Sequence, residues 1–460
     1  NSCRFNSGSS DNLQKTPSGD GNKTTFSVST WVKRSKLGAA HESIWSAGQY
    51  QSTAMVQVFF ESDDTIHVSQ FNAGGGQQAR LTTNRLFRDV SAWYHILAVW
   101  DTTNGTEANR LKLYVNGVQE TSFSTAAYPS QNDNTGANTT DIPITIGNRQ
   151  GHSLFFNGYQ CECVLLDGTA ATPTSFGEFD EDSGMWKPID VSGLTFGTNG
   201  YYLDFEASDN LGNDANGGTD FSENNLTAVD QSTDTCTNNF PTMNSLDNFY
   251  AAATFAEGNL QVTTGNSMYS YNTATIGVAS GKWYWEGKWS AQNTGSTNQV
   301  IFGIAKRTVV SATVWLGSVA WTYGYQGSTG HVHVSDGNAT NSTSTTYSVG
   351  DIISVAMDLD NNKIHFAKNG TYTNSSDPAG NSGGVAITAA DSTSGDSGFY
   401  FPAFGDGNAN LIQTGQFNFG AGPPYAISSG NADADGHGNF EFAVPSGYFA
   451  ICSKNLAEYG

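Results

Sequence analysis

The sequence predicts an all-β protein with two β-sandwich domains in tandem, joined by a polar linker. Only 13% of its residues are charged, 12% are aromatic, and Ser, Thr, Asn and Gly dominate the polar remainder. Ser, Thr and Asn compete with helical hydrogen bonds, whereas aromatic and β-branched residues favour strands. Strand-like patterns recur at short intervals, and each half contains an Asn-Gly dipeptide between two such patterns. These features are typical of sandwiches, and 460 residues suit two domains better than one.

The first half supplies several alternating or apolar runs. Residues 26–32 alternate in the manner of a half-buried strand, and residues 93–100 are apolar enough for burial on both faces. Residues 111–115 alternate and lead into Asn116-Gly117, which is the strongest short signal for a hairpin. We therefore expect a complete sandwich over residues 1–206.

The chain changes character after this first set of runs. Asn, Asp, Gly, Ser and Thr dominate residues 207–245, and apolar residues hardly repeat there. Such composition is typical of a linker. We expect a second sandwich over residues 246–427, followed by an extension at 428–460 that packs on it.

The second half repeats this architecture with different residues. Residues 282–289 place three tryptophans on one face of a strand, and residues 300–305 form a buried strand interrupted by glycine. Residues 351–358 and 363–368 are two further strands, and the second of them ends at Asn369-Gly370. The halves therefore share an architecture rather than a sequence.

Charge and cysteine content narrow the classes of function. The net charge of −22 disfavours binding to nucleic acid or to anionic membranes, and no apolar stretch reaches the length of a bilayer span. The five cysteines do not form a disulfide framework or two clustered zinc-binding pairs. We expect buried free thiols, with a bridge from Cys3 to Cys161 or Cys163 as the alternative.

Motifs in the two halves resemble two known families. Residues 1–206 resemble the laminin-G and pentraxin-like domains, which are concanavalin-like jelly rolls, through FSVSTWVK at 26–33, WYH at 93–95 and LKLYVNGV at 111–118. Residues 246–425 resemble a SPRY domain through SGKWYWE at 280–286, FGIA at 302–305 and DLDNNKIHFAKNG at 358–370. The resemblance implies two concanavalin-like jelly-roll sandwiches.

The chain as a whole is similar to virion and fibre proteins of marine tailed phages. The matching segments lie at residues 2–6, 175–188, 234–244 and 444–456. The resemblance implies a virion-surface or extracellular protein that contacts other virion proteins, copies of itself (with a trimer favoured) and a host-surface glycan or protein. A structural decoration or spacer protein, a cell-surface glycan-binding adhesin and a glycan hydrolase are the alternatives.

The sequence contains no recognisable catalytic apparatus. Glu178, Asp180 and Asp182 offer clustered carboxylates, but they lie between Pro173 and Pro188 without flanking β-branched residues. We interpret them as a solvated acidic connection rather than as the carboxylate pair of a glycosidase. Nucleophile-elbow, phosphate-loop and His-Glu-x-x-His motifs are missing from the sequence, so we expect a protein that is not an enzyme.

Two sets of residues are candidates for binding. Sugar sites pair aromatic rings with amides and carboxylates, and the densest aromatic cluster lies in the second half. Strand-like alternation there favours core packing as the competing interpretation. The candidates for ligand binding are Trp315, Trp321, Tyr323, Tyr325, His331 and His333, and those for a calcium cofactor are the loop residues Asp63, Asp64, Asp101 and Asn104.

Overall fold

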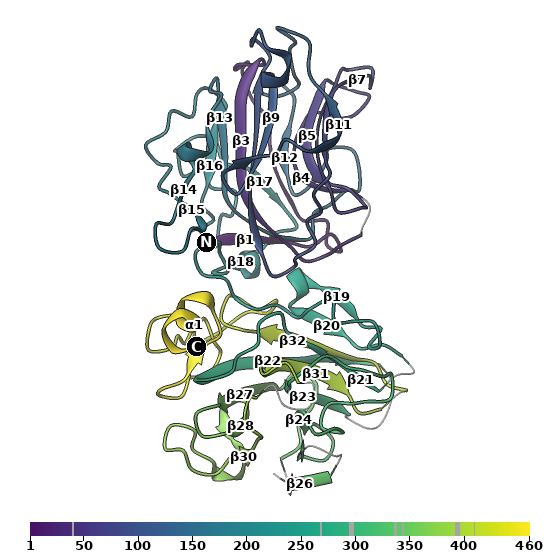
Figure 1. Cartoon of the computed structure of the whole chain (residues 1–460), viewed down its shortest axis with the longest axis vertical. Coiled ribbons are helices and arrows are strands. Elements are labelled where there is room, and N and C mark those ends of the chain that lie inside the picture. The colour runs from purple at the N-terminus through teal and green to yellow at the C-terminus, as the bar shows by residue number, and fades with distance from the viewer. Residues whose placement is uncertain are drawn as a thin grey trace. The chain divides into compact units, whose positions relative to one another are not determined.

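The computed structural model is nearly all-β and divides into two compact units (Figure 1). Unit 1 spans Asn1–Thr237 and unit 2 spans Asn238–Gly460. The structure describes residues 1–38, 41–266, 269–293, 299–334, 338–342, 345–391, 396–408 and 410–460. Within these ranges the one α-helix is the short α1 (Ser453–Tyr459), and no helix is long and apolar enough to cross a membrane. The predicted all-β class is confirmed.

Unit 1 contains two eight-stranded sheets. The first has the order β10-β9-β8-β3-β13-β1-β18, with β16 also paired to β13, and the second has the order β11-β7-β6-β5-β4-β12-β2-β17. The first comprises β1 (Ser2–Phe5), β3 (Thr25–Arg34), β8 (Trp93–Asp101), β9 (Leu111–Val115), β10 (Val118–Gln119), β13 (Gly158–Asp167), β16 (Tyr201–Leu203) and β18 (Gln231–Ser232). The second comprises β2 (Asn12–Lys15), β4 (Glu42–Ala47), β5 (Met55–Phe60), β6 (Ile66–Phe71), β7 (Gln77–Thr83), β11 (Phe123–Ala127), β12 (Ile144–Ile146) and β17 (Ser222–Asn224).

The core of unit 1 takes alternate side chains from both sheets. Val56, Val58 and Phe60 of β5 and Ile66 and Val68 of β6 all belong to it. Side chains alternate between the two faces of a strand, so the residues between them lie on the opposite face of the second sheet. That face carries the candidate site described below.

The segment expected to be a linker belongs largely to unit 1. Within residues 207–237, β17 pairs with β2 and β18 pairs with β1, and Leu211, Phe221 and Leu226 join the core. Asp234 is buried, accepts a hydrogen bond from Trp93 Nε1 at 3.1 Å and lies 2.7 Å from Lys33 Nζ. Irregularly spaced apolar residues and buried polar contacts hold this segment, and neither leaves a periodic signal in the sequence.

Unit 2 is built on a nine-stranded and a six-stranded sheet. The first has the order β19-β20-β32-β22-β27-β28-β29, with β30 paired to β28 and β33 to β22, and the second has the order β21-β31-β23-β24-β25-β26. The nine strands are β19 (Thr254–Ala256), β20 (Gln261–Thr263), β22 (Lys282–Gln292), β27 (Ile352–Asp358), β28 (Lys363–Lys368), β29 (Thr371–Tyr372), β30 (Val385–Ala386), β32 (Gln413–Asn418) and β33 (Phe449–Ala450). The six are β21 (Ser270–Thr273), β23 (Val300–Ala305), β24 (Thr322–Gln326), β25 (His331–Val334), β26 (Asn338–Ser342) and β31 (Phe401–Asp406).

The C-terminal segment of unit 2 packs along β22. β33 pairs with β22 in parallel, and the backbone N–H groups of Glu441 and Phe442 donate to the buried Glu286 carboxylate at 3.0 and 2.8 Å. Burial raises the pKa of Glu286, although these hydrogen bonds oppose the shift. On the other face of β22, Trp283, Trp285 and Trp289 lie in the core. Residues 428–460 are thus integral to this unit.

Unit 1 also contains a small two-stranded sheet of β14 (Gly177–Phe179) and β15 (Trp186–Pro188). Of the acidic residues singled out in the sequence, Glu178 lies in β14, and Asp180 and Asp182 lie in the turn between the two strands. Asp180 accepts hydrogen bonds from Ser183 N–H at 2.9 Å and from Lys187 Nζ at 3.0 Å. These bonds lower the pKa of the half-buried Asp180 and stabilise the turn. The carboxylate here has a local structural role.

Candidate functional site in the first unit

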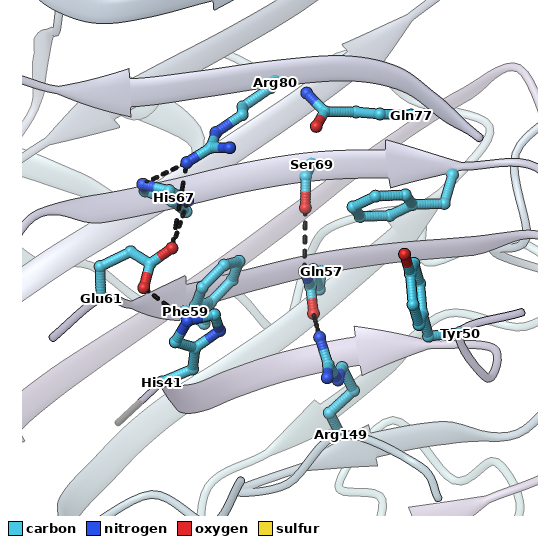
Figure 2. A pocket seen from close by; sticks show the side chains of 11 residues that line it. His41, Tyr50, Gln57, Phe59, Glu61, His67, Ser69, Gln77, Arg80 and Arg149 are labelled. Carbon is cyan, nitrogen blue, oxygen red and sulfur yellow. Dashed lines mark hydrogen bonds and ion pairs between the residues drawn. The ribbon is translucent and has the colours of Figure 1, made fainter. Parts of the chain in front are cut away.

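A pocket lies on the face of the second sheet of unit 1 that is opposite the core (Figure 2). Its cavity volume is about 180 Å³, below the roughly 300 Å³ at which pockets for drug-sized ligands begin. That volume suits one residue of a larger ligand. The pocket is lined by His41, Tyr50, Gln57, Phe59, Glu61, His67, Ser69, Phe71, Gln77, Arg80 and Arg149.

Strand register explains how these side chains meet. Phe59 of β5 lies opposite His67 of β6, and Gln57 lies opposite Ser69. Ser69 in turn lies opposite Arg80 of β7. Cross-strand partners have their Cβ atoms about 5 Å apart, so three adjacent strands place their outward residues in one patch. The loops that flank β4 and β12 add the remaining walls.

Glu61 organises one end of the pocket. Its carboxylate lies 2.7 Å from His41 Nε2, 3.1 Å from His67 Nδ1 and 3.9 Å from an Arg80 guanidinium nitrogen. Burial lowers the pKa of His67 to about 3, and the nearby Arg80 acts in the same direction. The neutral ring therefore donates from Nδ1 to Glu61 and accepts at Nε2 from Arg80, which is 3.2 Å away. One tautomer satisfies both contacts.

Arg149 and Gln57 define the other end. The Gln57 amide donates to Ser69 Oγ at 3.0 Å, and its carbonyl oxygen lies 3.5 Å from Arg149 Nη1. The Arg149 guanidinium lies 5.7 Å from the centroid of the Tyr50 ring, within the range of a cation–π contact. Burial lowers the pKa of Arg149, although it stays charged at neutral pH. Figure 2 shows Arg149 and Arg80 on opposite sides of Gln57 and Ser69.

Aromatic rings form the apolar part of the walls. The Phe59 ring stacks on His41 at 5.1 Å and meets the His67 ring edge-on at 5.0 Å. Tyr50 contacts Phe71 edge-on, also at 5.1 Å. Rings beside an amide, a hydroxyl and guanidinium groups are the combination that recognises sugars, because sugars present both apolar faces and hydroxyls.

Glu61 is the single carboxylate among the residues that line the pocket. Hydrolysis of a glycoside by the usual route requires two carboxyl groups that flank the scissile bond. The Glu61 carboxylate is moreover already engaged by two histidines. The described residues of this pocket therefore offer binding groups without a hydrolytic pair.

The ligand-binding residues predicted in the second half do not form one surface. Tyr323 and Tyr325 of β24 are 2% and 0% exposed and belong to the core of unit 2. Their alternation is that of a strand with its aromatic side inward, so neither ring can present a face to a ligand. For these two residues the core-packing interpretation describes the structure.

The other four predicted residues lie in two places. The half-buried Trp321 is covered by the Arg307 guanidinium at 3.4 Å and donates to Tyr271 Oη at 3.2 Å. The Trp315 ring meets His333 edge-on at 4.9 Å, and the rings of His331 and His333 are 6.1 Å apart. His333 is nearly buried and its Nε2 contacts Gln326 Oε1 at 3.1 Å. Trp321 thus contacts Arg307 and Tyr271, whereas Trp315, His331 and His333 contact one another in a second place.

The predicted calcium ligands form hydrogen bonds and ion pairs with neighbouring residues. Asp64 is buried beside Arg34 at 3.1 Å and Arg88 at 2.9 Å, so two guanidinium groups already neutralise it. Asp63 accepts from Thr65 Oγ1 at 2.6 Å, while Asp101 accepts from Thr103 Oγ1 at 2.6 Å and from the Asn104 amide at 3.3 Å. Over the described ranges, no cluster of three His, Cys, Asp or Glu side chains is placed to hold a metal ion.

Sequence reasoning missed the pocket of unit 1. One signal was present, because Gln57, Phe59, His67 and Ser69 are the polar or aromatic members of two alternating runs. Tyr50 and Arg149 lie in loops 99 positions apart, and only the pairing of β12 with β4 brings those loops together. No local pattern reports that juxtaposition.

Two family descriptions match the chain. Residues 7–175 match a laminin-G family that is described as the concanavalin A-like lectin/glucanases superfamily. Residues 282–421 match the SPRY domain. Unit 1 carries a laminin-G-like domain and unit 2 carries a SPRY domain. This confirms the family expected for each half, and the first match contains all eleven pocket residues. No curated protein matches the chain.

Three solved structures illustrate the similarity of the chain to known folds. The SPRY domain of human HERC1 is 18% identical, with a TM-score of 0.26, over 34% of this chain and 86% of its own. The heptameric SAP-like pentraxin from Limulus polyphemus is 15% identical, with a TM-score of 0.27, over 35% and 71%. Domains LG4-5 of the mouse laminin α1 chain are 9% identical, with a TM-score of 0.30, over 88% and 80%.

Proposed function

We propose that this chain is a non-enzymatic, surface-displayed binding protein that holds a glycan in the pocket of its first unit. The observation that carries the proposal is the combination of Tyr50 and Phe59 with Gln57, Ser69 and Arg149 in one cavity. The Tyr50 ring offers apolar surface for a sugar face, while the amide, hydroxyl and guanidinium groups offer donors and acceptors for its hydroxyls. The match to a lectin/glucanase superfamily supports the same role.

We further propose that the protein is displayed on a phage particle, as a virion-surface or tail-fibre component. The four segments that resemble marine-phage virion proteins support this placement. On a particle the bound glycan belongs to the host surface. Contacts with other virion proteins and assembly into a homo-oligomer, a trimer by preference, are part of the same proposal.

Glycan binding is tested with the purified full chain on an array of bacterial and algal glycans. We expect binding that Tyr50→Ala and Gln57→Ala each reduce at least tenfold, because each variant removes a wall of the cavity. Tyr250→Ala is the matched control, since it removes an exposed tyrosine of unit 2. Binding to no glycan, or binding that survives both pocket variants, would refute the role of the pocket.

Two further measurements separate the competing functions. Polysaccharides incubated with the chain should release no reducing ends, whereas a glycan hydrolase would release them. Antibodies raised against unit 1 should label intact particles and block their adsorption to host cells. Labelling without an effect on adsorption would favour a decoration or spacer protein, and labelling of a cell surface instead would favour an adhesin.

A further inference from the structure

We propose that the pocket of unit 1 selects an acidic sugar residue and that Arg149 binds its oxyanion. This inference rests on the proposed glycan-binding function and adds a ligand class, namely glycans that carry a carboxylate or a sulfate. Arg80, at the opposite side of the cavity, is the second cationic group.

Arg149 is a half-buried cation that has no ion-pair partner among the residues that the structure describes. Among the described residues, the one hydrogen bond that its guanidinium makes is the long 3.5 Å contact with Gln57 Oε1. Its Nε is buried and makes no hydrogen bond within the described part of the chain, and Glu61 acts on it only at long range. A buried, incompletely bonded guanidinium is costly unless a partner arrives. The guanidinium faces a pocket, so a ligand can supply that partner.

The remaining charges of the pocket do not cancel this cation. The Glu61 carboxylate is shared between His41, His67 and Arg80. His67 is neutral, because burial and Arg80 lower its pKa to about 3. Two arginines against one glutamate leave the cavity with a net positive charge.

The positive charge of this pocket contrasts with the acidic composition of the chain as a whole. There are 42 Asp and Glu against 20 Lys and Arg, so acidic partners are abundant. Other buried cations of unit 1 form ion pairs with carboxylates: Lys33 pairs with Asp234 at 2.7 Å, and Arg34 pairs with Glu42 at 3.0 Å. Arg149 faces Tyr50 and Gln57 instead. A half-buried guanidinium with no carboxylate partner among the described residues of an acidic protein points to an anionic ligand.

The geometry of the guanidinium defines the chemistry of that ligand. Its planar fork donates two parallel hydrogen bonds to a carboxylate or a sulfate, and it stays charged at every relevant pH. Tyr50 beside it can cover one face of the same sugar ring. Uronates and sulfated sugars share this oxyanion-plus-ring chemistry, and the ligand panel must distinguish them.

The test measures the affinity of the full chain for length-matched oligosaccharides of three kinds: a polyuronate, a sulfated galactan and a neutral β-glucan. We expect at least tenfold tighter binding to one acidic class than to the neutral one. Arg149→Gln should abolish that preference, and Arg149→Lys should retain only part of it, because lysine keeps the charge and loses the fork. Which acidic class binds identifies the oxyanion.

Arg85→Gln is the matched control. Arg85 lies in the same unit, is exposed and pairs with Glu120 at 3.0 Å outside the pocket, so its loss should change affinity less than twofold. Thermal melting of each variant establishes that it folds. In case Arg149→Gln does not fold, competition on the wild-type chain gives a second readout, in which free glucuronate should displace the bound oligosaccharide and glucose should not.

The outcomes separate this inference from the proposed function. Equal affinity for acidic and neutral glycans, with loss of both in Tyr50→Ala, would overturn the inference and leave glycan binding intact. An acidic preference that survives Arg149→Gln would also overturn it. Binding to none of the three classes or to any arrayed glycan would remove the proposed function itself.

Discussion

Buried histidines make the first unit sensitive to acid. His95 is fully buried, accepts from Trp186 Nε1 at 3.0 Å and contacts Ser29 Oγ through Nε2 at 2.8 Å. Because the indole can only donate, Nδ1 is the acceptor and Nε2 carries the proton. Burial lowers the pKa of His95 to about 3, and His67 in the pocket reaches the same value. Both rings are neutral in the folded state.

We therefore expect the first unit to lose stability as the pH falls from 6.5 towards 4. The unfolded chain protonates both histidines below a pKa of about 6.5, while the fold keeps them neutral, so the unfolded state binds more protons. Each histidine contributes up to roughly 1.4 kcal/mol per pH unit in this window. Hydrogen exchange of β3 and β8 amides in the full chain measures the effect. His95→Gln should lower the stability at pH 7 and flatten its pH dependence; an unchanged slope would contradict the assignment.

Two of the five free cysteines lie close enough to react with each other. The Sγ atoms of Cys161 and Cys236 are 3.9 Å apart, at positions 75 residues distant in the sequence. The structure thus brings together a different pair from the bridges of Cys3 that the sequence left open. Cys161 is buried and Cys236 is half-buried, so a small oxidant reaches the pair from the Cys236 side.

We expect oxidised glutathione to convert this pair into a disulfide. The two thiols lose two protons and two electrons, and the glutathione disulfide is reduced to two thiols. The cross-link should stabilise unit 1 by roughly 2–4 kcal/mol, because it closes a long loop in the unfolded chain. Peptide mapping without reduction identifies the linkage, and Cys236→Ser should prevent it while Cys3→Ser should not. A linkage through Cys3 would refute this pairing.

At the level of elements, β18 and the residues around it close the first sheet with polar contacts. Arg4 of β1 pairs with Asp230 at 3.2 Å and donates to Val229 O at 2.9 Å. Asp234 pairs with Lys33 of β3 at 2.7 Å. Breaking a buried ion pair leaves an uncompensated charge, which costs far more than an exposed pair is worth.

Asp234→Ala should destabilise unit 1 by about 3–5 kcal/mol, because it leaves the Lys33 ammonium and the Trp93 indole N–H buried without this partner. Asp182→Ala, at an exposed turn, should change the stability by less than about 0.5 kcal/mol. Urea unfolding followed by tryptophan fluorescence compares the two. Equal effects would show that Asp234 does not anchor the segment.

At the level of the whole molecule, the chain consists of two units with separate cores, divided between Thr237 and Asn238. Residues 207–237 provide two edge strands and three core side chains of the first unit. A domain that loses part of its core and two strand pairings loses more free energy than typical domain stabilities of 5–15 kcal/mol provide.

We expect the fragments 1–237 and 238–460 each to fold alone and the fragment 1–206 to remain unfolded. Calorimetry should give one cooperative transition for each of the longer fragments and none for 1–206. A native-like transition in the fragment 1–206 would show that the first unit folds without residues 207–237 and that this segment is a linker.

The alternation of apolar and polar residues predicted much of the fold. The alternation at residues 111–115 and 363–368 and the Asn-Gly dipeptides correspond to β9 and β28 and the hairpins that follow them. These signals are local, since a strand with one buried face must alternate and a tight turn needs residues that tolerate positive φ. The same alternation misled the choice of Tyr323 and Tyr325, because a ring on a strand has equal periodicity whether it faces the core or a ligand.

The all-β class, the two sandwich families and the acidic character that disfavours nucleic acid can all be predicted from the sequence. Contacts between distant segments are needed to show that residues 207–237 complete the first sandwich and that Cys161 lies beside Cys236. The same is true of the cavity that Arg149 and Tyr50 share with Gln57. The physical reason is range: periodicity and turns act between neighbours in the chain, whereas a pocket and a buried ion pair depend on which strands become neighbours in space.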